Sequence, residues 1–183
     1  EKAAQFIQLC NQIYVPILFL HNITGYIVGT DFEQGGITKN GSKMINAVSN
    51  STVPHISIIV GASYGAGNFG MSGRAFGPRF SFIWPTAKIA VMGPRQMAGV
   101  MSIVQRAAAT RRGVPFDEEA DAKRAAHVEY WAEERSLGLY ATSRVSDDGM
   151  IDPRDTRTVL GMVLSACANE VIEGARGYGV WRM

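Results

Sequence analysis

A buried strand that runs into a glycine-rich turn constrains the fold of this chain more than any other stretch. Residues 56–60 are Ile or Val except for Ser57, which predicts a strand covered on both faces. The segment 61–70 is rich in glycine and lacks proline, and residues 71–76 are expected to continue as a helix. The chain should therefore contain a strand, a tight turn and a helix in direct succession.

Such a junction presents unpaired backbone N–H groups, at the positive end of a helix, to an incoming oxygen. No nucleophile or acid–base pair stands inside the stretch, because Ser63 and Tyr64 have no evident partner. A site at Gly65 would therefore act through its backbone. The glycines could equally serve close packing of the helix on the strand, and the turn alone gives both interpretations equal weight.

Two nucleotide-binding interpretations of the turn are weak. A dinucleotide fingerprint requires an acidic residue about 20 residues further on, at the end of a second strand. This chain has Trp84, Pro85 and Thr86 in that region. A phosphate-binding loop requires Gly-Lys-Ser or Gly-Lys-Thr, which the turn lacks.

Apolar spacing predicts that helices and strands alternate in the first half of the chain. The expected elements are helices at 2–12 and 36–48, and strands at 15–20, 56–60, 80–84 and 88–92. A glycine-rich loop, 23–30, follows the first strand. Strands that alternate with helices predict a parallel sheet joined by right-handed crossovers.

The second half is predicted to be mainly helical. One helix should cover 96–111. Another, at 117–135, is dense in charge, which is typical of a solvated lid or an oligomer contact. Asp152 is a natural N-cap for the last long helix, with Pro153 at its first position.

The composition narrows the class of protein. The 183 residues are 46% hydrophobic and 19% charged, which is enough for one substantial core. A net charge of +2 does not favour a nucleic-acid partner, and no apolar run approaches the roughly 18 residues of a membrane span. Cys10 and Cys167 lie far apart in apolar surroundings, which indicates reduced thiols in a reducing compartment. The chain begins in helical rhythm without an initiator Met, so we expect a segment of a longer protein whose first strands lie upstream.

No side-chain constellation typical of catalysis is evident. His21, at a strand end, is interpreted as a hydrogen-bonded structural residue rather than a general base. His55 and His127 are also interpreted as structural, because no Ser, Cys or carboxylate constellation stands near them. Asp31 and Glu33 precede a predicted helix and are expected to cap its N-terminus. Any chemistry must then come from backbone donors and from the substrates themselves.

Longer motifs occur in order along the chain, at 22–29, 33–37, 41–44, 64–71, 84–93 and 148–157. Together they resemble the carboxyltransferase (β) subunit of biotin-dependent acyl-CoA carboxylases, in register from residue 1 to 183. The resemblance is to the second, C-terminal and biotin-side, of that family's two related domains. It implies an α/β fold of the crotonase-like (ClpP/crotonase) type, a ββα superhelix that is incomplete at its N-terminus.

Two departures from the propionyl- and acetyl-CoA branch narrow the resemblance. That branch usually has a proline before the glycine of the first loop and an aspartate in the second turn, where this chain has Thr24 and Phe69. Together with the C-terminal residues 179–183, these departures are similar to the 3-methylcrotonyl-CoA and geranyl-CoA carboxylases. They imply a branched acyl-CoA substrate of the leucine degradation type. Phe69 would suit a bulkier acyl pocket than aspartate does.

The resemblance also implies roles for individual residues. Ala66 and Gly67 correspond to the backbone N–H pair that stabilises the ureido oxygen of biotin. The residues expected to shape the rest of the substrate and biotin site are Gly25, Gly29, Gly36, Tyr64, Gly65 and Phe69. In the family mechanism carboxybiotin loses CO₂, the biotin enolate takes a proton from the acyl-CoA, and the acyl-CoA enolate attacks CO₂. Neither a side-chain base nor a metal in this domain is required.

The implied partners are a biotin carboxylase and carrier (α) subunit and further copies of the β subunit, most often in a hexamer. The acyl-CoA would be held by the first domain of a neighbouring subunit, so this segment alone should be inactive. The implied location is the bacterial cytoplasm or the mitochondrial matrix, with neither nucleic acid nor membrane as a partner.

Two functions of other classes remain open beside the carboxyltransferase. A crotonase-type acyl-CoA hydratase or isomerase would share the fold but needs an Asp or Glu over the substrate, for which Asp31 and Glu33 are the nearby candidates. A non-catalytic homologue would keep only the assembly contacts. A propionyl- or acetyl-CoA carboxyltransferase is the alternative within the family.

Overall fold

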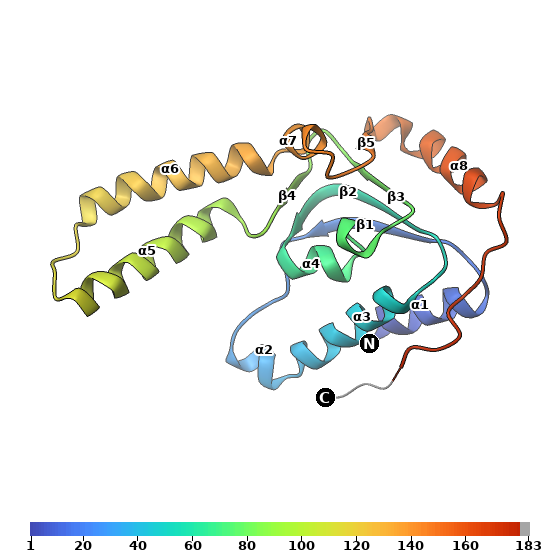
Figure 1. The fold of residues 1–183 in the computed structure, drawn as a ribbon, viewed down its shortest axis with the longest axis horizontal. Coiled ribbons are helices and arrows are strands. Elements are labelled where there is room, and N and C mark those ends of the chain that lie inside the picture. The colour runs from blue at the N-terminus through green and yellow to red at the C-terminus, as the bar shows by residue number, and fades with distance from the viewer. Residues whose placement is uncertain (180–183) are drawn as a thin grey trace.

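A five-stranded sheet forms the centre of the molecule (Figure 1). The computed structural model describes residues 1–179, so residues 180–183 of the C-terminal stretch used above lie outside the described part. The strands are β1 (Ile17–Ile23), β2 (His55–Tyr64), β3 (Phe80–Ile83), β4 (Lys88–Ala90) and β5 (Gly149–Met150). They lie in the order β1-β2-β3-β5, with β4 paired to β2, and every pairing is parallel. The predicted parallel sheet is confirmed.

The central strand is β2, and its apolar run explains that position. Ile56, Ile58 and Ile59 are each at most 3% exposed, as expected for a strand covered on both faces. Its pairing with β3 ends at Ile59, and its last residues, 62–64, pair with β4 instead. β2 therefore carries the glycine turn beyond the carboxyl end of β3.

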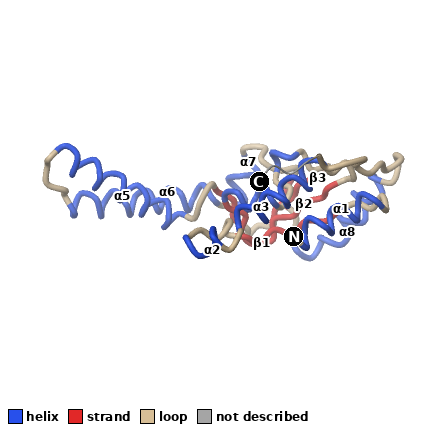
Figure 2. The backbone as a smooth tube through the Cα atoms, turned by 90° about the horizontal axis from the view of Figure 1, so that it is seen from below, coloured by secondary structure: helices blue, strands red, loops and turns tan. Residues whose placement is uncertain are grey.

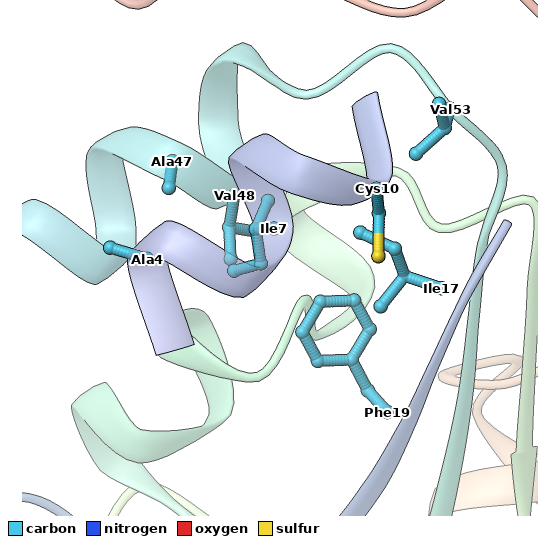
Figure 3. Close-up of a cluster of buried hydrophobic side chains, with 8 residues drawn as sticks. All are labelled: Ala4, Ile7, Cys10, Ile17, Phe19, Ala47, Val48 and Val53. Carbon is cyan, nitrogen blue, oxygen red and sulfur yellow. The ribbon is translucent and has the colours of Figure 1, made fainter. Parts of the chain in front are cut away.

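The helices α1 (Lys2–Gln12) and α3 (Ile37–Asn50) pack together beside β1 (Figure 3). Ile7 and Cys10 of α1, Ile17 and Phe19 of β1 and Val48 of α3 belong to one buried cluster. The regularly spaced apolar residues that predicted helices at 2–12 and 36–48 therefore form the helix faces that pack on the sheet.

A second part of the core lies between the sheet and α8 (Thr156–Cys167). Ile58 of β2 and Phe82 of β3 pack there with Val163 of α8. Cys167 of the same helix is a buried free thiol, as is Cys10, which agrees with the predicted reduced state.

Two helices of 19 residues each form an arm that projects from the sheet (Figures 1 and 2). α5 (Pro94–Arg112) ends at Gly113, whose φ of +65° suits glycine, and α6 (Glu118–Ser136) returns alongside it. Asp117 caps α6 by accepting a hydrogen bond from the Ala120 N–H at 2.9 Å. Both predicted helices are confirmed. No helix within residues 1–179 is long and apolar enough to cross a membrane.

The short helix after β2 differs from the prediction. α4 (Gly65–Gly70) occupies the glycines themselves, whereas residues 71–76, predicted to be helical, contain only the 3-10 turn η1 (Arg74–Phe76). Ser72, with φ of +56°, ends the helical path after Gly70. The prediction was wrong because glycine has low intrinsic helix propensity, and close tertiary packing overrides that propensity here.

The segments around 30 and 152 also refine the predictions. Asp31 and Glu33 do not cap the helix that follows them but lie in the first turn of a separate short helix, α2 (Thr30–Gln34). Asp152 does cap a helical segment, because its carboxylate accepts from the Arg154 N–H at 2.8 Å. That segment is the 3-10 turn η2 (Pro153–Asp155), from which α8 continues. A further short helix, α7 (Gly138–Ser143), was not predicted.

Candidate active site at the glycine turn

The turn after β2 requires glycine at its first position. Tyr64 still has extended backbone angles, and Gly65 then adopts φ of +55°, a left-handed conformation. A Cβ on Gly65 would also lie only 2.8 Å from the carbonyl oxygen of Val91. Glycine satisfies both constraints because it has no Cβ. The strand can therefore turn sharply into α4 at the carboxyl end of the sheet.

The next glycines let α4 lie directly on the loop that follows β1. A Cβ on Gly67 would lie 3.0 Å from Cγ1 of Ile23 and 3.1 Å from the Cα of Gly25. A Cβ on Gly70 would lie 2.5 Å from the hydroxyl of Tyr26. Close packing is therefore one reason for these glycines, as the structural interpretation expected.

The first turn of α4 also leaves backbone donors uncommitted. The N–H groups of Ala66 and Gly67 belong to the helical turn that has no intrahelical acceptor, and no side chain caps α4. Ala66 is exposed, while Gly67 is buried against the loop. The N–H groups of Ala66 and Gly67 thus lie in the first turn of α4, and their role as donors to a ligand stays a prediction.

A pocket of about 330 Å³ opens beside Ala66. Its walls come from the loop after β1, from α2 and from α3, and most of them are apolar. The lining residues are Tyr26, Ile27, Val28, Glu33, Ile37, Thr38, Gly41, Ser42, Ile45 and Ala66. An apolar pocket with few polar groups next to free backbone donors is a typical arrangement for a small-molecule site.

The glycines predicted to form the facing wall shape the chain around this pocket without lining it. Gly25, Gly29 and Gly36 have φ values of +114°, +131° and +90°, and Gly29 and Gly36 precede α2 and α3 respectively. Tyr64 is the last residue of β2. Phe69 packs edge to face on Phe76, with ring centroids 5.8 Å apart, and it does not belong to the pocket wall either.

The sequence did not reveal the apolar residues that do line the pocket. Ile37, Gly41 and Ile45 follow one another every fourth residue on α3, so they share one face of that helix. Their period was visible in the sequence, but only the tertiary structure shows that this face turns toward Ala66. Tyr26 adds a buried hydroxyl without a hydrogen-bond partner among the described residues, and burial raises the pKa of this phenol.

Two histidines make serine contacts that the sequence did not reveal. Nδ1 of His21 lies 2.9 Å from Oγ of Ser63, and Nδ1 of His55 lies 2.8 Å from Oγ of Ser72. The expectations that Ser63 has no partner and that no serine stands near His55 are therefore wrong, because these contacts form between different strands and turns. Burial lowers the pKa of both histidines to about 4, in His21 against a smaller opposing effect of the Met71 backbone. Neither histidine lines the pocket beside Ala66.

Within residues 1–179, no group of three or more His, Cys, Asp or Glu side chains is placed to hold a metal ion. The pocket combines an apolar wall with the carboxylate of Glu33 and the hydroxyl-bearing residues Tyr26, Thr38 and Ser42, beside the first turn of α4.

The chain is similar to acyl-CoA carboxylase subunits along its whole length. A probable biotin-dependent acyl-coenzyme A carboxylase β2 subunit of Mycobacterium tuberculosis is 62% identical over 100% of this chain and 35% of its own length. The mitochondrial methylcrotonoyl-CoA carboxylase β chain of Arabidopsis thaliana is 49% identical over 100% of this chain and 31% of its own. This chain therefore spans about a third of the length of these relatives.

Solved structures agree. The geranyl-CoA carboxylase β subunit of P. aeruginosa superposes with a TM-score of 0.86 at 44% identity, over 100% of this chain and 34% of its own. The transcarboxylase 12S hexamer, solved with methylmalonyl-coenzyme A bound, superposes with a TM-score of 0.77 at 32% identity. The match covers 92% of this chain and 30% of the 12S chain. The family model of the carboxyl transferase domain matches residues 1–176. The chain belongs to the carboxyl transferase domain family and has its crotonase-like fold.

Proposed function

We propose that this chain is the biotin-side half of an acyl-CoA carboxyltransferase, which transfers CO₂ from carboxybiotin to an acyl-CoA. One observation carries the proposal: the uncapped N–H groups of Ala66 and Gly67 stand where α4 begins, and Ala66 borders an apolar pocket. Carboxybiotin on a carrier domain would supply both the CO₂ and the base that the reaction needs. The chain's own task is then to bind and to stabilise charge.

The two backbone donors would stabilise the ureido oxygen of biotin as negative charge develops on it. Preorganised donors of this kind are commonly worth about 3 to 4 kcal/mol each, or roughly 10²–10³ in rate. The apolar residues Ile37 and Ile45 would keep water from that charge, which strengthens the interaction. Gly25, Gly29, Gly36, Tyr64 and Gly65 would hold the surrounding backbone in place, in agreement with the positive φ values of the glycines.

The proposed substrate is a branched acyl-CoA such as 3-methylcrotonyl-CoA. The relatives named for methylcrotonyl-CoA are 44–49% identical, whereas the propionyl-CoA carboxylase and methylmalonyl-CoA carboxyltransferase relatives are 35% and 32% identical. Phe69 supports this assignment only through its place in the sequence, since it packs on Phe76 outside the pocket.

The proposed cofactor and partners follow from the same relationship. Biotin would arrive on a biotin carboxylase and carrier (α) subunit, and copies of the β subunit would assemble, as the 12S relative does in its hexamer. Residues 1–183 would be the C-terminal half of that subunit. Bacterial and mitochondrial relatives support a location in the bacterial cytoplasm or the mitochondrial matrix.

The test is an acyl-CoA panel with the full-length protein and its biotinylated partner subunit. We expect carboxylation of 3-methylcrotonyl-CoA or geranyl-CoA with a higher kcat/KM than of propionyl-CoA or acetyl-CoA. Carboxylation of the last two alone would refute the branch assignment. Failure of the assembled complex to carboxylate any of them would favour a non-catalytic assembly role.

A crotonase-type hydratase or isomerase is the second candidate, because the carboxylate-bearing Glu33 lines the same pocket. Asp31, the other carboxylate considered, lies on α2 outside that pocket wall. Hydration of an enoyl-CoA without biotin or its carrier would support this candidate and would contradict the carboxyltransferase proposal.

A further inference from the structure

The same combination of side chains, an asparagine, a serine and a histidine, occurs at both ends of β2. We call the first the turn network: Nδ2 of Asn68 donates to Oγ of Ser63 at 2.8 Å, and Nδ1 of His21 lies 2.9 Å from the same oxygen. The second, the base network, has Nδ2 of Asn11 donating to Oγ of Ser51 at 2.7 Å, with Nε2 of His55 2.8 Å from that oxygen.

The two networks differ in what they enclose. The Asn68–Ser63 hydrogen bond closes the segment 64–67, which contains both proposed donors, Ala66 and Gly67. The base network instead ties α1 to the end of α3 and to the first residue of β2, at the opposite end of that strand. The turn network therefore encloses the donors directly, whereas the base network reaches Ser72, beyond the end of α4, through the 2.8 Å contact of Nδ1 of His55 with the Ser72 hydroxyl.

The members of the turn network are themselves fixed. Ser63 and His21 are fully buried, on the neighbouring strands β2 and β1. The carbonyl oxygen of Asn68 accepts from the Gly73 N–H at 2.8 Å, and Oδ1 of Asn68 lies so close to Gly73 that a Cβ there would approach it to 1.8 Å. The backbone of Asn68 is thus bonded to Gly73, and its side chain lies between Gly73 and Ser63.

The donor and acceptor roles in the turn network are consistent with each other. The Asn68 amide donates to the Ser63 oxygen, which leaves the Ser63 hydroxyl proton free to be donated to His21. A neutral imidazole can accept it at Nδ1, and burial keeps His21 neutral near pH 7 because it lowers the pKa of the ring to about 4. In the tautomer of His21 that carries its proton on Nε2, the chain of hydrogen bonds runs in one direction, from Asn68 through Ser63 to His21.

We propose that Asn68, Ser63 and His21 are positioning residues that hold the backbone N–H groups of Ala66 and Gly67 in the orientation the oxyanion requires. The proposal rests on the function proposed above. It follows from geometry: backbone donors stabilise a transition state only when they are aligned before the reaction, and a displacement of about 1 Å can cost 10²-fold in rate. A short helix with no capping side chain needs such external support.

The test compares matched variants of the two networks in the full-length β subunit, assembled with its biotinylated partner. Ser63→Ala breaks the turn network and Ser51→Ala breaks the base network, and each removes one hydroxyl held by an asparagine and a histidine. We expect Ser63→Ala to lower kcat by roughly 10- to 100-fold. The KM for acyl-CoA should stay within about twofold, because the acyl-CoA is bound elsewhere. Both variants should lower the unfolding temperature by similar amounts, because each loses the hydrogen bonds of one serine hydroxyl. Ser51→Ala should nevertheless leave kcat near the wild-type value.

A second variant makes the test independent of whether Ser63→Ala folds. Asn68→Leu roughly keeps the size of the side chain but can neither donate to Ser63 nor accept from it, at a partly exposed position. It should lower kcat as Ser63→Ala does, and the double variant should lose little more than either single one, because both break the same bond.

The outcomes separate the two proposals. Wild-type kcat in Ser63→Ala or in Asn68→Leu, or an equal loss of kcat in Ser63→Ala and Ser51→Ala, would overturn the positioning role alone. An assembled wild-type complex without carboxyltransferase activity would refute the proposed function and the positioning role with it.

Discussion

Gly67 lies against Gly25 so closely that a Cβ on Gly67 would come within 3.1 Å of the Gly25 Cα. The contact joins α4 to the loop after β1, and thus one proposed donor to the wall that carries Tyr26 of the pocket. Gly25 itself has φ of +114°, which is open to glycine and strained for other residues. The turn and the loop can therefore lie this close together because both contact residues, Gly67 and Gly25, lack a side chain.

Gly67→Ala should damage activity more than stability. In a helix, alanine is favoured over glycine by about 1 kcal/mol, and the overpacking against Gly25 and Ile23 costs roughly 1 to 3 kcal/mol. The two effects largely cancel in the free energy of unfolding, while the displaced loop should lower kcat. Chemical unfolding and steady-state kinetics of the full-length enzyme measure both.

The matched control is Gly99→Ala on α5, where nothing lies within 4 Å of the added Cβ. It should raise the free energy of unfolding by about 1 kcal/mol. An equal gain in Gly67→Ala, with unchanged kcat, would show that the turn tolerates a side chain and would contradict the packing argument.

Ala66→Pro isolates one backbone donor. The N–H of Ala66 lies in the first helical turn and has no intrahelical acceptor, so proline there costs the helix no hydrogen bond. We expect kcat to fall by roughly 10²–10³. The unfolding temperature should also fall, because proline disfavours the helical conformation of the residue before it, here Gly65 with φ of +55°. Ala66→Gly, which keeps the N–H, should retain most of the activity. Equal turnover in the two variants would remove Ala66 from the proposed oxyanion site.

Glu33→Gln separates the two enzyme classes. If the chain is a carboxyltransferase, the variant should keep kcat within about twofold, because no side-chain base is needed. A hydratase that uses Glu33 as its acid or base should lose roughly 10²- to 10⁴-fold. Asp31→Asn, on the same helix but outside the pocket wall, controls for the loss of a charge near the site.

The buried histidines should make the fold sensitive to acid. His21 and His55 have pKa values of about 4 in the folded chain, against 6.5 for the ordinary histidine side chain. Between these values the unfolded chain binds more protons, so the free energy of unfolding falls as the pH is lowered through that window. The loss should reach up to roughly 3 kcal/mol per histidine near pH 4.

Urea unfolding between about pH 7 and pH 4 measures this slope. His55→Gln, which cannot be protonated, should lower the stability near pH 7 because the serine contacts change, but should make the slope shallower. A free energy of unfolding that stays constant over this range would contradict the prediction, because it would show that burial does not lower the pKa of the two rings.

Local sequence patterns predicted most of the fold and only part of the site. The apolar runs at 56–60 and 2–12 identified a strand and a helix because their periods are local properties of the chain. The tight turn between strand and helix was also predictable from its glycines, while its role as a source of backbone donors stays a prediction. The helical state of Gly65–Gly70 was not, because it depends on contacts with residues 23–26, some forty positions away in the chain.

The same limit applies to the side chains around the turn. His21 and Ser63 are separated by 42 positions and meet only because β1 and β2 are neighbours in the sheet. Ile37 and Ile45 were recognisable as one helical face, but a single sequence does not distinguish a face that covers a core from one that lines a pocket.

The pairing of β4 with the end of β2 gives the projecting arm a mechanical connection to the turn. Lys88, Ile89 and Ala90 lie opposite residues 62–64, and Val91 touches Gly65 three residues before α5 begins at Pro94. Lys88 also forms an ion pair with Glu133 near the end of α6, so both helices of the arm are fastened to the same short strand. The base of the arm is therefore joined through β4 to residues 62–64, directly before the turn that holds the proposed backbone donors.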